Sequence, residues 1–216
     1  MQFDIVTIFP ELFDSIFGTS ILKRAIEDGK IVVNFHDPRN FSADKHRTVD
    51  DTPYGGGPGM VMKVEPLVAA LRQIERLDNS VSLLLSAKGE RFVQAQAKNF
   101  CEDLDQIILV CGRYEGVDER VLEYLHGEIS IGDFVLTGGE LGAAVIVDAV
   151  TRLIPGVLGD DASATEESHS EPGYIEYPHY TRPEDFEGRR VPEVLLSGNH
   201  GAIKKWREEQ SRKQEG

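Results

Sequence analysis

Short apolar runs alternate with longer amphipathic segments over the first three-quarters of the chain. Apolar runs of strand length occur at residues 3–9, 31–35, 81–86, 107–111 and 129–131. Between them, apolar residues recur every three or four positions, as they do on one face of a helix. These helical segments cover residues 11–29, 65–77, 91–101, 117–125 and 140–152. The alternation predicts an α/β fold in which helices cover both faces of a mostly parallel sheet.

The character of the sequence changes after Pro155. Residues 159–175 are mostly small, polar and acidic and lack apolar periodicity, which is typical of a flexible linker. Residues 176–216 hold a proline-rich extended part and a short helix that begins near Gly201, and they are too few to build a substantial core alone. We therefore expect a main domain at residues 1–158, then a linker, then a small C-terminal domain.

The composition supports a hydrophobic core and argues against a membrane protein. Apolar residues make up 40% of the chain, and no apolar segment approaches transmembrane length. The N-terminal run carries Asp4 and lacks a basic region before it, so it predicts a strand and not a signal peptide. Cys101 and Cys111 cannot form a disulfide framework, and we interpret them as reduced thiols of a cytoplasmic protein.

The formal net charge of −14 opposes indiscriminate binding to nucleic acids, because attraction to phosphate is the main sequence-independent contribution to such binding. The charge is unevenly distributed, however. Basic side chains gather towards the C-terminus, at Arg182, Arg189, Arg190, Lys204, Lys205, Arg207, Arg212 and Lys213. The negative net charge is therefore compatible with a local basic surface in the C-terminal part of the chain.

Three of the predicted strands end in loops that contain glycine. The loops lie within LLLSAKGER at residues 83–91, ILVCGRYEGVDER at 108–120 and ISIGDFVLTGGEL at 129–141. Open α/β sheets bind ligands beyond the carboxyl ends of their strands, so the three loops predict a binding site. A GxGxxG pattern and a Walker A lysine are both missing, which argues against an ordinary dinucleotide or nucleoside-triphosphate site.

Several side chains in and near these loops are candidates for chemistry. Tyr114 could stack on a base, and Glu115 could hold a metal ion, a ribose or an amino group; the plainer alternative is a surface ion pair of Arg113 with Glu115 or Glu119. The segment PYGGGPGM at residues 53–60 lets a flat base come close because no Cβ blocks it, although it could be only a long turn. The histidines and carboxylates of HDPR and DKHRTVDD lack the spacing of metal ligands.

Taken in order, several motifs resemble those of the bacterial tRNA (guanine-N1)-methyltransferase family, a group of knotted SPOUT-class enzymes. The matching stretches span nearly the whole chain and are FDIVTIFPELF, DDTPYGGGPGMVMKVEP, LLLSAKGERF, CGRYEGVDER, EISIGDFVLTGGELGAAVIVDAVTRLIPGVLG, YPHYTRP and VPEVLLSGNH. The resemblance implies an α/β domain with a C-terminal trefoil knot, followed by a small helical domain that contacts tRNA. It also implies a homodimer that binds S-adenosylmethionine and methylates N1 of guanosine 37 when nucleotide 36 is also guanosine.

The resemblance also assigns residues to the cofactor and to the target base. Those implied to bind the cofactor are Leu85, Ser86, Gly112, Tyr114, Glu115, Gly116, Ser130, Ile131, Gly132, Asp133, Phe134, Val135, Leu136, Gly138 and Gly139. Gly57, Gly59 and Met60 are implied to lie near the target base. The family is also described as dependent on Mg²⁺, for which Glu115 is a possible contact, but we assign no set of metal ligands.

The two implied catalytic residues are Glu167 and Arg152. Guanine N1 carries a proton, so a carboxylate at Glu167 would act as the general base that removes it. Arg152 would stabilise the negative charge that develops towards O6, since its guanidinium stays charged and offers several donors.

The chain departs from the family pattern at a few positions. Glu167 stands where the family has aspartate. The stretches LSAKG and GGELG each lack a proline that the family has there. The C-terminal domain is also expected to be shortened. The extra methylene of Glu167 displaces the carboxylate by about 1 Å, and such a displacement can cost about 100-fold in rate. A cofactor-binding or RNA-binding module of the same fold with weak or no catalysis therefore remains the alternative.

Overall fold

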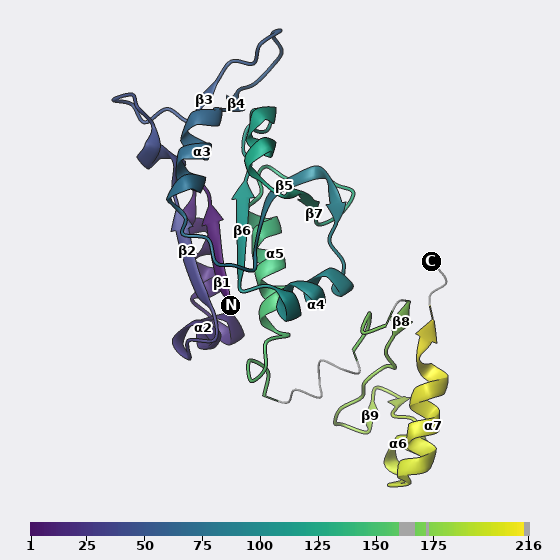
Figure 1. The fold of residues 1–216 in the computed structure, drawn as a ribbon. Helices are drawn as coiled ribbons and strands as arrows, with labels where there is room; N and C mark the ends of the chain where they lie inside the picture. The colour runs from purple at the N-terminus through teal and green to yellow at the C-terminus, as the bar shows by residue number, and fades with distance from the viewer. Residues whose placement is uncertain (160–166, 172, 214–216) are drawn as a thin grey trace. The chain divides into compact units, whose positions relative to one another are not determined.

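The computed structural model describes residues 1–159, 167–171 and 173–213. The chain falls into two compact units, Met1–Gly159 and Asp160–Gly216 (Figure 1). No helix in the described part of the chain is long and apolar enough to cross a membrane.

The first unit is built on a five-stranded sheet in the order β2-β1-β6-β5-β7. Its strands are β1 (Gln2–Val6), β2 (Val32–His36), β5 (Ser80–Arg91), β6 (Gln106–Cys111) and β7 (Gly127–Ser130). Every neighbouring pair is parallel, which confirms the predicted parallel sheet. All six residues of the central strand β6 are buried, as expected of a strand covered on both faces.

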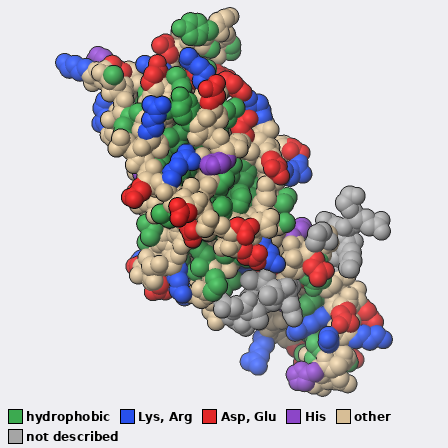
Figure 2. Space-filling model, in the orientation of Figure 1, with side chains coloured by type: hydrophobic (Ala, Val, Ile, Leu, Met, Phe, Trp, Pro, Cys, Tyr) green, Lys and Arg blue, Asp and Glu red, His purple; other side chains and the backbone are tan. Residues whose placement is uncertain are grey.

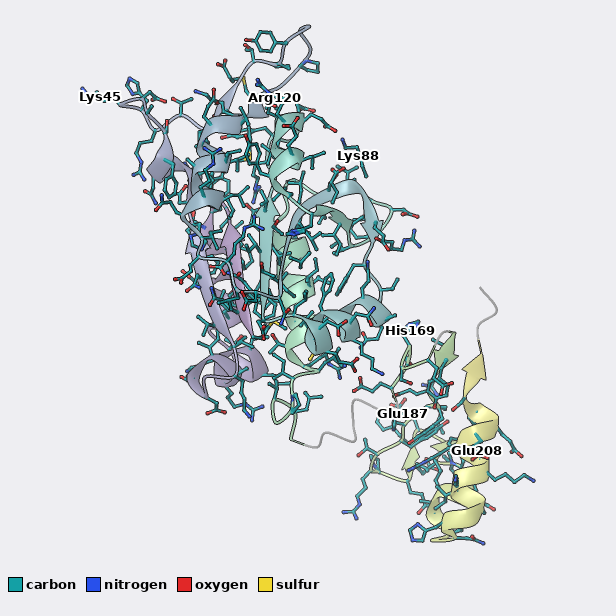
Figure 3. All side chains as sticks on the ribbon, viewed as in Figure 1. Lys45, Lys88, Arg120, His169, Glu187 and Glu208 are labelled. Carbon is teal, nitrogen blue, oxygen red and sulfur yellow. The ribbon has the colours of Figure 1, made fainter. Side chains whose placement is uncertain are left out.

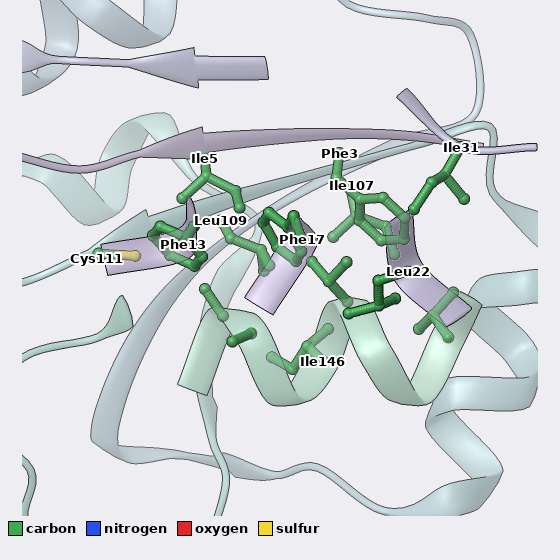
Figure 4. Close-up of a cluster of buried hydrophobic side chains, with 14 of the residues drawn as sticks. Phe3, Ile5, Phe13, Phe17, Leu22, Ile31, Ile107, Leu109, Cys111 and Ile146 are labelled. Carbon is green, nitrogen blue, oxygen red and sulfur yellow. The ribbon is translucent and has the colours of Figure 1, made fainter. Parts of the chain in front are cut away.

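Two hydrophobic clusters lie on the two faces of this sheet and confirm that helices cover both. In one cluster, Phe3 and Ile107 are buried with residues of α1 (Asp14–Phe17), α2 (Ser20–Glu27) and α5 (Glu140–Thr151), as Figure 4 shows. α4 (Gln94–Asp103) contributes Ala97 to the same cluster. In the other cluster, Val6 and Val110 are buried with residues of α3 (Val64–Gln73) and of the 3-10 helix η3 (Glu119–Tyr124).

Some elements differ from those predicted. The single helix expected at residues 11–29 is divided into η1 (Pro10–Phe13), α1 and α2, since the chain is extended at Thr19 and enters α2 with a positive φ at Ser20. The α-helix expected at residues 117–125 is the 3-10 helix η3. This short connection must cross the face of the sheet from the end of β6 to the start of β7, and a 3-10 helix rises about 2.0 Å per residue against 1.5 Å for an α-helix.

Strand β5 is also longer than predicted, and it reaches Arg91 because its last residues pair again with β7 after an irregularity between Leu85 and Glu90. As a result α4 begins at Gln94 and not at residue 91. A further 3-10 helix, η2 (Pro38–Phe41), and the short antiparallel pair of β3 (Asp50–Asp51) and β4 (Val61–Met62) follow β2. Figure 1 shows the glycine-rich segment between β3 and β4 projecting from the rest of the first unit.

Within its described residues, the second unit contains two short antiparallel strand pairs and two helices. β8 (Tyr174–Ile175) pairs with β11 (Arg212–Lys213), and β9 (Asp185–Phe186) pairs with β10 (Arg189–Arg190). The helices are α6 (Glu193–Leu196) and α7 (His200–Gln210). Not one side chain described in this unit is buried. Of the linker expected at residues 159–175, residues 160–166 and 172 lie outside the described residues, while Tyr174 and Ile175 belong to β8.

Candidate active site

A cavity of about 480 Å³ lies at the carboxyl ends of β5, β6 and β7, where the sequence predicts a ligand site. This volume is within the range of pockets that hold small molecules, about 300–1,000 Å³. All the residues that the resemblance assigns to the cofactor line the cavity, with the exception of Asp133. Asp133 instead forms an ion pair with Arg91.

Glycines allow the loop after β7 to approach the other strands closely. The backbone N–H of Gly139 donates a hydrogen bond of 3.0 Å to the carbonyl oxygen of Gly112, directly after β6. A Cβ on Gly139 would lie 2.8 Å from the Cα of Cys111, and a Cβ on Gly142 would lie 2.9 Å from Cδ1 of Leu85. A side chain at Gly139 would therefore push the backbone of the cavity wall apart, whereas one at Gly142 would displace only the end of the Leu85 side chain.

Tyr114 occupies the centre of the loop that follows β6. Its φ of 61° places a non-glycine residue in the left-handed region, a strained conformation that often marks a functional site. Burial and the nearby Asp50 carboxylate raise the pKa of Tyr114 above its ordinary value, so its hydroxyl stays protonated at neutral pH. The side chain is 49% exposed and lines the cavity, which leaves its ring available to a ligand.

The glycine-rich segment lies next to the loop of Tyr114. The backbone N–H of Glu115 donates to the carbonyl oxygen of Met60 at 2.9 Å, and the N–H of Met62 donates to that of Gly116 at 2.9 Å. Gly59 packs so closely on Glu115 that a Cβ at this position would lie 2.5 Å from its Cγ. The three residues implied to lie near the target base, Gly57, Gly59 and Met60, do not line the cavity, but backbone hydrogen bonds connect their segment to its wall.

Arg113 does not form the surface ion pair considered from the sequence. It pairs with Glu140 at the start of α5, and the Arg113 Nε lies 2.9 Å from Oε2 of Glu140. The side chain of Glu140 is 3% exposed and also accepts a hydrogen bond of 2.9 Å from the Thr7 hydroxyl. Glu119 pairs with Lys88 on the surface instead, at 3.4 Å. Neither Glu140 nor Thr7 is among the candidates predicted from the sequence. The position of Glu140 directly after two glycines was a signal that could have indicated it, whereas nothing in the sequence around Thr7 indicates a role.

Neither Arg152 nor Glu167 is among the described residues that line the cavity. Arg152 caps the C-terminal end of α5, whereas Gly139 at the other end of the helix lines the cavity. Thirteen residues at about 1.5 Å each separate these two positions by about 20 Å. Glu167 belongs to the second unit, where its carbonyl oxygen accepts a hydrogen bond of 3.0 Å from the N–H of Ser170.

The described residues contain no group of three histidine, cysteine, aspartate or glutamate side chains that could hold a metal ion. Basic and acidic side chains are interspersed on the face of the first unit seen in Figure 2. Two exposed cations near the carboxyl end of the sheet, Lys88 and Arg120, are labelled in Figure 3, and each has an acidic partner, Glu119 and Asp118 respectively. Both of these cations are therefore paired with a carboxylate.

The second unit combines cations with aromatic rings. The guanidinium of Arg207 lies 4.8 Å from the ring centroid of Tyr177, and the ring of Tyr180 lies 6.3 Å from that of Trp206. Arg189 and Arg190 are exposed in β10, and Arg190 pairs with Asp185 at 3.0 Å. The basic residues noted in the sequence therefore include some that lie among aromatic side chains.

Comparison with known proteins agrees with the resemblance seen in the sequence. The family model described as tRNA (guanine-1)-methyltransferase TrmD matches residues 1–215. A tRNA (guanine-N(1)-)-methyltransferase of Caldanaerobacter subterraneus subsp. tengcongensis is 55% identical over 98% of this chain and 87% of its own length. One of Chloroflexus aggregans is 56% identical over 96% of this chain and 81% of its own. The chain therefore belongs to the tRNA (guanine-1)-methyltransferase family of enzymes.

Proposed function

We propose that this protein transfers the methyl group of S-adenosylmethionine to N1 of guanosine 37 in tRNA molecules that also carry guanosine at position 36. The observation that carries the proposal is the cavity at the carboxyl ends of β5, β6 and β7, together with membership of the family. Because its substrate is tRNA, we propose that the protein acts in the cytoplasm.

The residues that line the cavity fit S-adenosylmethionine. Glycines leave backbone amides and carbonyls open to the edges of an adenine, and the side chains of Leu85, Ile131 and Leu136 offer apolar surface to its faces. Bound there, the cofactor would supply a methyl group already activated by its sulfonium, so the protein's tasks are alignment and deprotonation of the base. The trefoil knot in this part of the chain is likewise proposed from membership of the family.

Glu115 could supply one ligand to a magnesium ion, but it is a single carboxylate and not a complete set of ligands. It offers one carboxylate at the cavity wall, and Mg²⁺ commonly binds through one or two carboxylates while it keeps several water molecules. A requirement for Mg²⁺ in the transfer reaction would be measured by chelation and readdition of the ion.

The glycine-rich segment and the second unit are the surfaces we assign to tRNA. The segment can admit a flat base because Gly55, Gly56 and Gly57 have open space where a Cβ would stand. In the second unit, rings such as Tyr180 and Trp206 can stack on bases, and neighbouring arginines can contact phosphates. With a net charge of −14 on the whole chain, such local contacts must carry the affinity, which should fall steeply with salt.

We further propose that the protein is a homodimer and that α5 packs against its copy. Leu141, Val145, Asp148 and Arg152 follow one another at spacings of four, three and four residues, which places them on one face of the helix. Leu141 and Val145 are 58% and 46% exposed, although both are apolar. In an antiparallel pair of α5 helices, the Arg152 of a second copy would lie near the first turn of α5 and thus near the cavity.

In this arrangement Arg152 would donate to O6 of the target guanine, and Glu167 would remove the proton from N1. The two steps belong together, because negative charge develops on the base as the proton leaves. Glutamate in place of the family's aspartate keeps the carboxylate and changes only its reach.

Single-turnover transfer of a labelled methyl group to tRNA transcripts with guanosine or adenosine at position 37 tests this function. We expect transfer to the guanosine transcript alone and N1-methylguanosine on digestion. Binding of S-adenosylmethionine without any transfer would favour the alternative of a module with little catalysis, for which the glutamate at position 167 is the specific observation.

A further inference from the structure

The ion pair between Arg113 and Glu140 lies directly behind the loop that closes one side of the cavity. Glu140 does not line the cavity, whereas Arg113 does. The Nε of Arg113 contacts both carboxylate oxygens of Glu140, at 3.1 Å from Oε1 and 2.9 Å from Oε2. The Thr7 hydroxyl donates to Oε1 as well, so one buried carboxylate connects the end of β1, the loop after β6 and the start of α5.

Arg113 also forms a hydrogen bond with the loop after β7. Its Nη1 donates a hydrogen bond of 3.3 Å to the carbonyl oxygen of Thr137. Its guanidinium carbon lies 4.6 Å from the ring centroid of Phe9, which restricts the side chain from the other side. The guanidinium is thus fixed by Glu140 and Phe9 and in turn fixes Thr137.

The next residue of the loop rests on the ion pair itself. A Cβ on Gly138 would lie 2.6 Å from Cδ of Arg113 and 2.6 Å from Oε2 of Glu140, so only glycine fits without displacement. Gly139 then donates its N–H to Gly112 at 3.0 Å. The backbone of residues 137–139 belongs to the cavity wall. The pair holds it through one hydrogen bond to Thr137 and one close packing contact at Gly138, and the hydrogen bond from Gly139 to Gly112 holds it further.

We propose that Arg113 and Glu140 are positioning residues of the cofactor site, which hold the backbone of residues 137–139 in the conformation that accepts S-adenosylmethionine. This inference rests on the proposed function, because it takes the cavity as the cofactor site. The planar fork of arginine is essential to it, since Nε and Nη1 bind two acceptors at once and a lysine ammonium cannot reproduce that geometry.

A merely structural ion pair would behave differently. Its loss would lower the stability of the fold, but the molecules that remain folded would bind the cofactor as before. A positioning pair changes the affinity of the folded protein, because the loop must be reordered when the ligand binds. The two roles are separated by measuring cofactor affinity and thermal stability in the same variants.

The experiment uses Arg113→Lys and Glu140→Gln, which keep side chains of similar size, and the double variant. Asp4→Asn is the matched control, because Asp4 is also a buried carboxylate and is 1% exposed. It accepts a hydrogen bond from Gln106 at the start of β6, which is the end of the strand opposite the cavity. The dissociation constant for S-adenosylmethionine is measured by calorimetry at a temperature where every variant is folded, and the melting temperature is recorded without ligand.

We expect Arg113→Lys to raise the dissociation constant by on the order of tenfold, equal to one lost interaction of ordinary strength. Glu140→Gln should raise it by several-fold although Glu140 does not reach the cavity, and the double variant should be no weaker than Arg113→Lys. Asp4→Asn should lower the melting temperature and leave the dissociation constant unchanged.

An unchanged dissociation constant in Glu140→Gln would overturn the proposal, as would an increase in Asp4→Asn equal to that in Arg113→Lys. Strictly additive effects of the two substitutions would also overturn it, because Arg113 and Glu140 would then act independently. Failure of the proposed function has another signature, since the unsubstituted protein itself would not bind S-adenosylmethionine.

Discussion

Asp4 and Glu140 are two buried carboxylates of the same domain with different kinds of partner. Glu140 binds an arginine beside the cavity, whereas Asp4 lies in a cluster of polar side chains formed by Gln2, Asn34, His36 and Gln106. Burial raises the pKa of Asp4, but its hydrogen bonds together outweigh burial, so the pKa lies below the ordinary value of 3.8. Asp4 therefore stabilises the fold in its charged form.

This pKa predicts how stability depends on pH. A carboxyl group whose pKa is lowered by folding contributes stability above its unfolded pKa, and the contribution disappears as the pH falls through the folded pKa. We expect Asp4→Asn to lower the free energy of unfolding by about 2 kcal/mol at neutral pH. The difference from the unsubstituted protein should shrink as the pH falls below 3.8. Urea unfolding curves at pH 7, 5 and 3 measure it, and a constant difference would contradict the assignment.

The proposed role of Glu167 as general base predicts how its substitution changes the rate of methyl transfer. If it is the general base, Glu167→Gln removes the proton acceptor and should lower the single-turnover rate by on the order of 100-fold or more. The affinity for S-adenosylmethionine should stay nearly constant. Glu167→Asp serves as the control, because it keeps the acid and restores the side chain usual in the family; retained turnover in Glu167→Gln would remove this residue from the mechanism.

Helix α5 combines a buried face with an exposed apolar stripe. Ile146, Val147 and Val150 are completely buried on the sheet side, whereas Leu141 and Val145 face away from the core. An apolar stripe on the outside of a helix that is already packed needs a partner to be covered. We therefore expect α5 to pack against the sheet with one face and, in the proposed dimer, against a second copy with the other.

The stripe predicts that a charge at Val145 separates the proposed dimer. Val145→Glu places a carboxylate near the middle of the expected helix pair, and we expect monomers in sedimentation velocity at micromolar concentration. Leu77→Glu is the matched control, because Leu77 is also apolar and 39% exposed but lies outside α5. Dimers that persist in Val145→Glu would show that α5 is not the interface.

For the whole molecule, the distance between the two ends of α5 has a direct consequence. One chain cannot bring its own Arg152 to the end of α5 that lines the cavity, about 20 Å away along the helix. The catalytic centre would therefore combine the cavity of one copy with the arginine of another.

Subunit complementation tests this arrangement. Arg152→Ala leaves the cavity intact, and Gly139→Val distorts its wall, because a side chain at Gly139 would meet the backbone of Cys111. Each variant alone should be inactive in methyl transfer. After the two are mixed, unfolded and refolded together, mixed dimers should regain activity, because one of their two sites has both an open cavity and an arginine. No recovery would mean that Arg152 acts within its own chain or not at all.

Much of the architecture was predictable because it depends on periodicity. The buried run at β6 and the helical pattern at α5 are long enough to be unambiguous, and the glycine loops after them indicated the cavity. The 3-10 form of η3 and the late continuation of β5 were not predictable, because both depend on how far the chain must travel across the sheet. The partnership of Thr7 with Glu140 joins residues 133 positions apart and left no local signal.

The second unit buries no described side chain, and this has a thermodynamic consequence. Because its described apolar side chains are at most partly buried, burial offsets only part of its conformational entropy within the unit itself. We expect its order to be completed against tRNA, so that part of the folding of this protein takes place in the complex. Titration calorimetry with tRNA at several temperatures should then give a heat-capacity change more negative than the docking of two rigid bodies would produce.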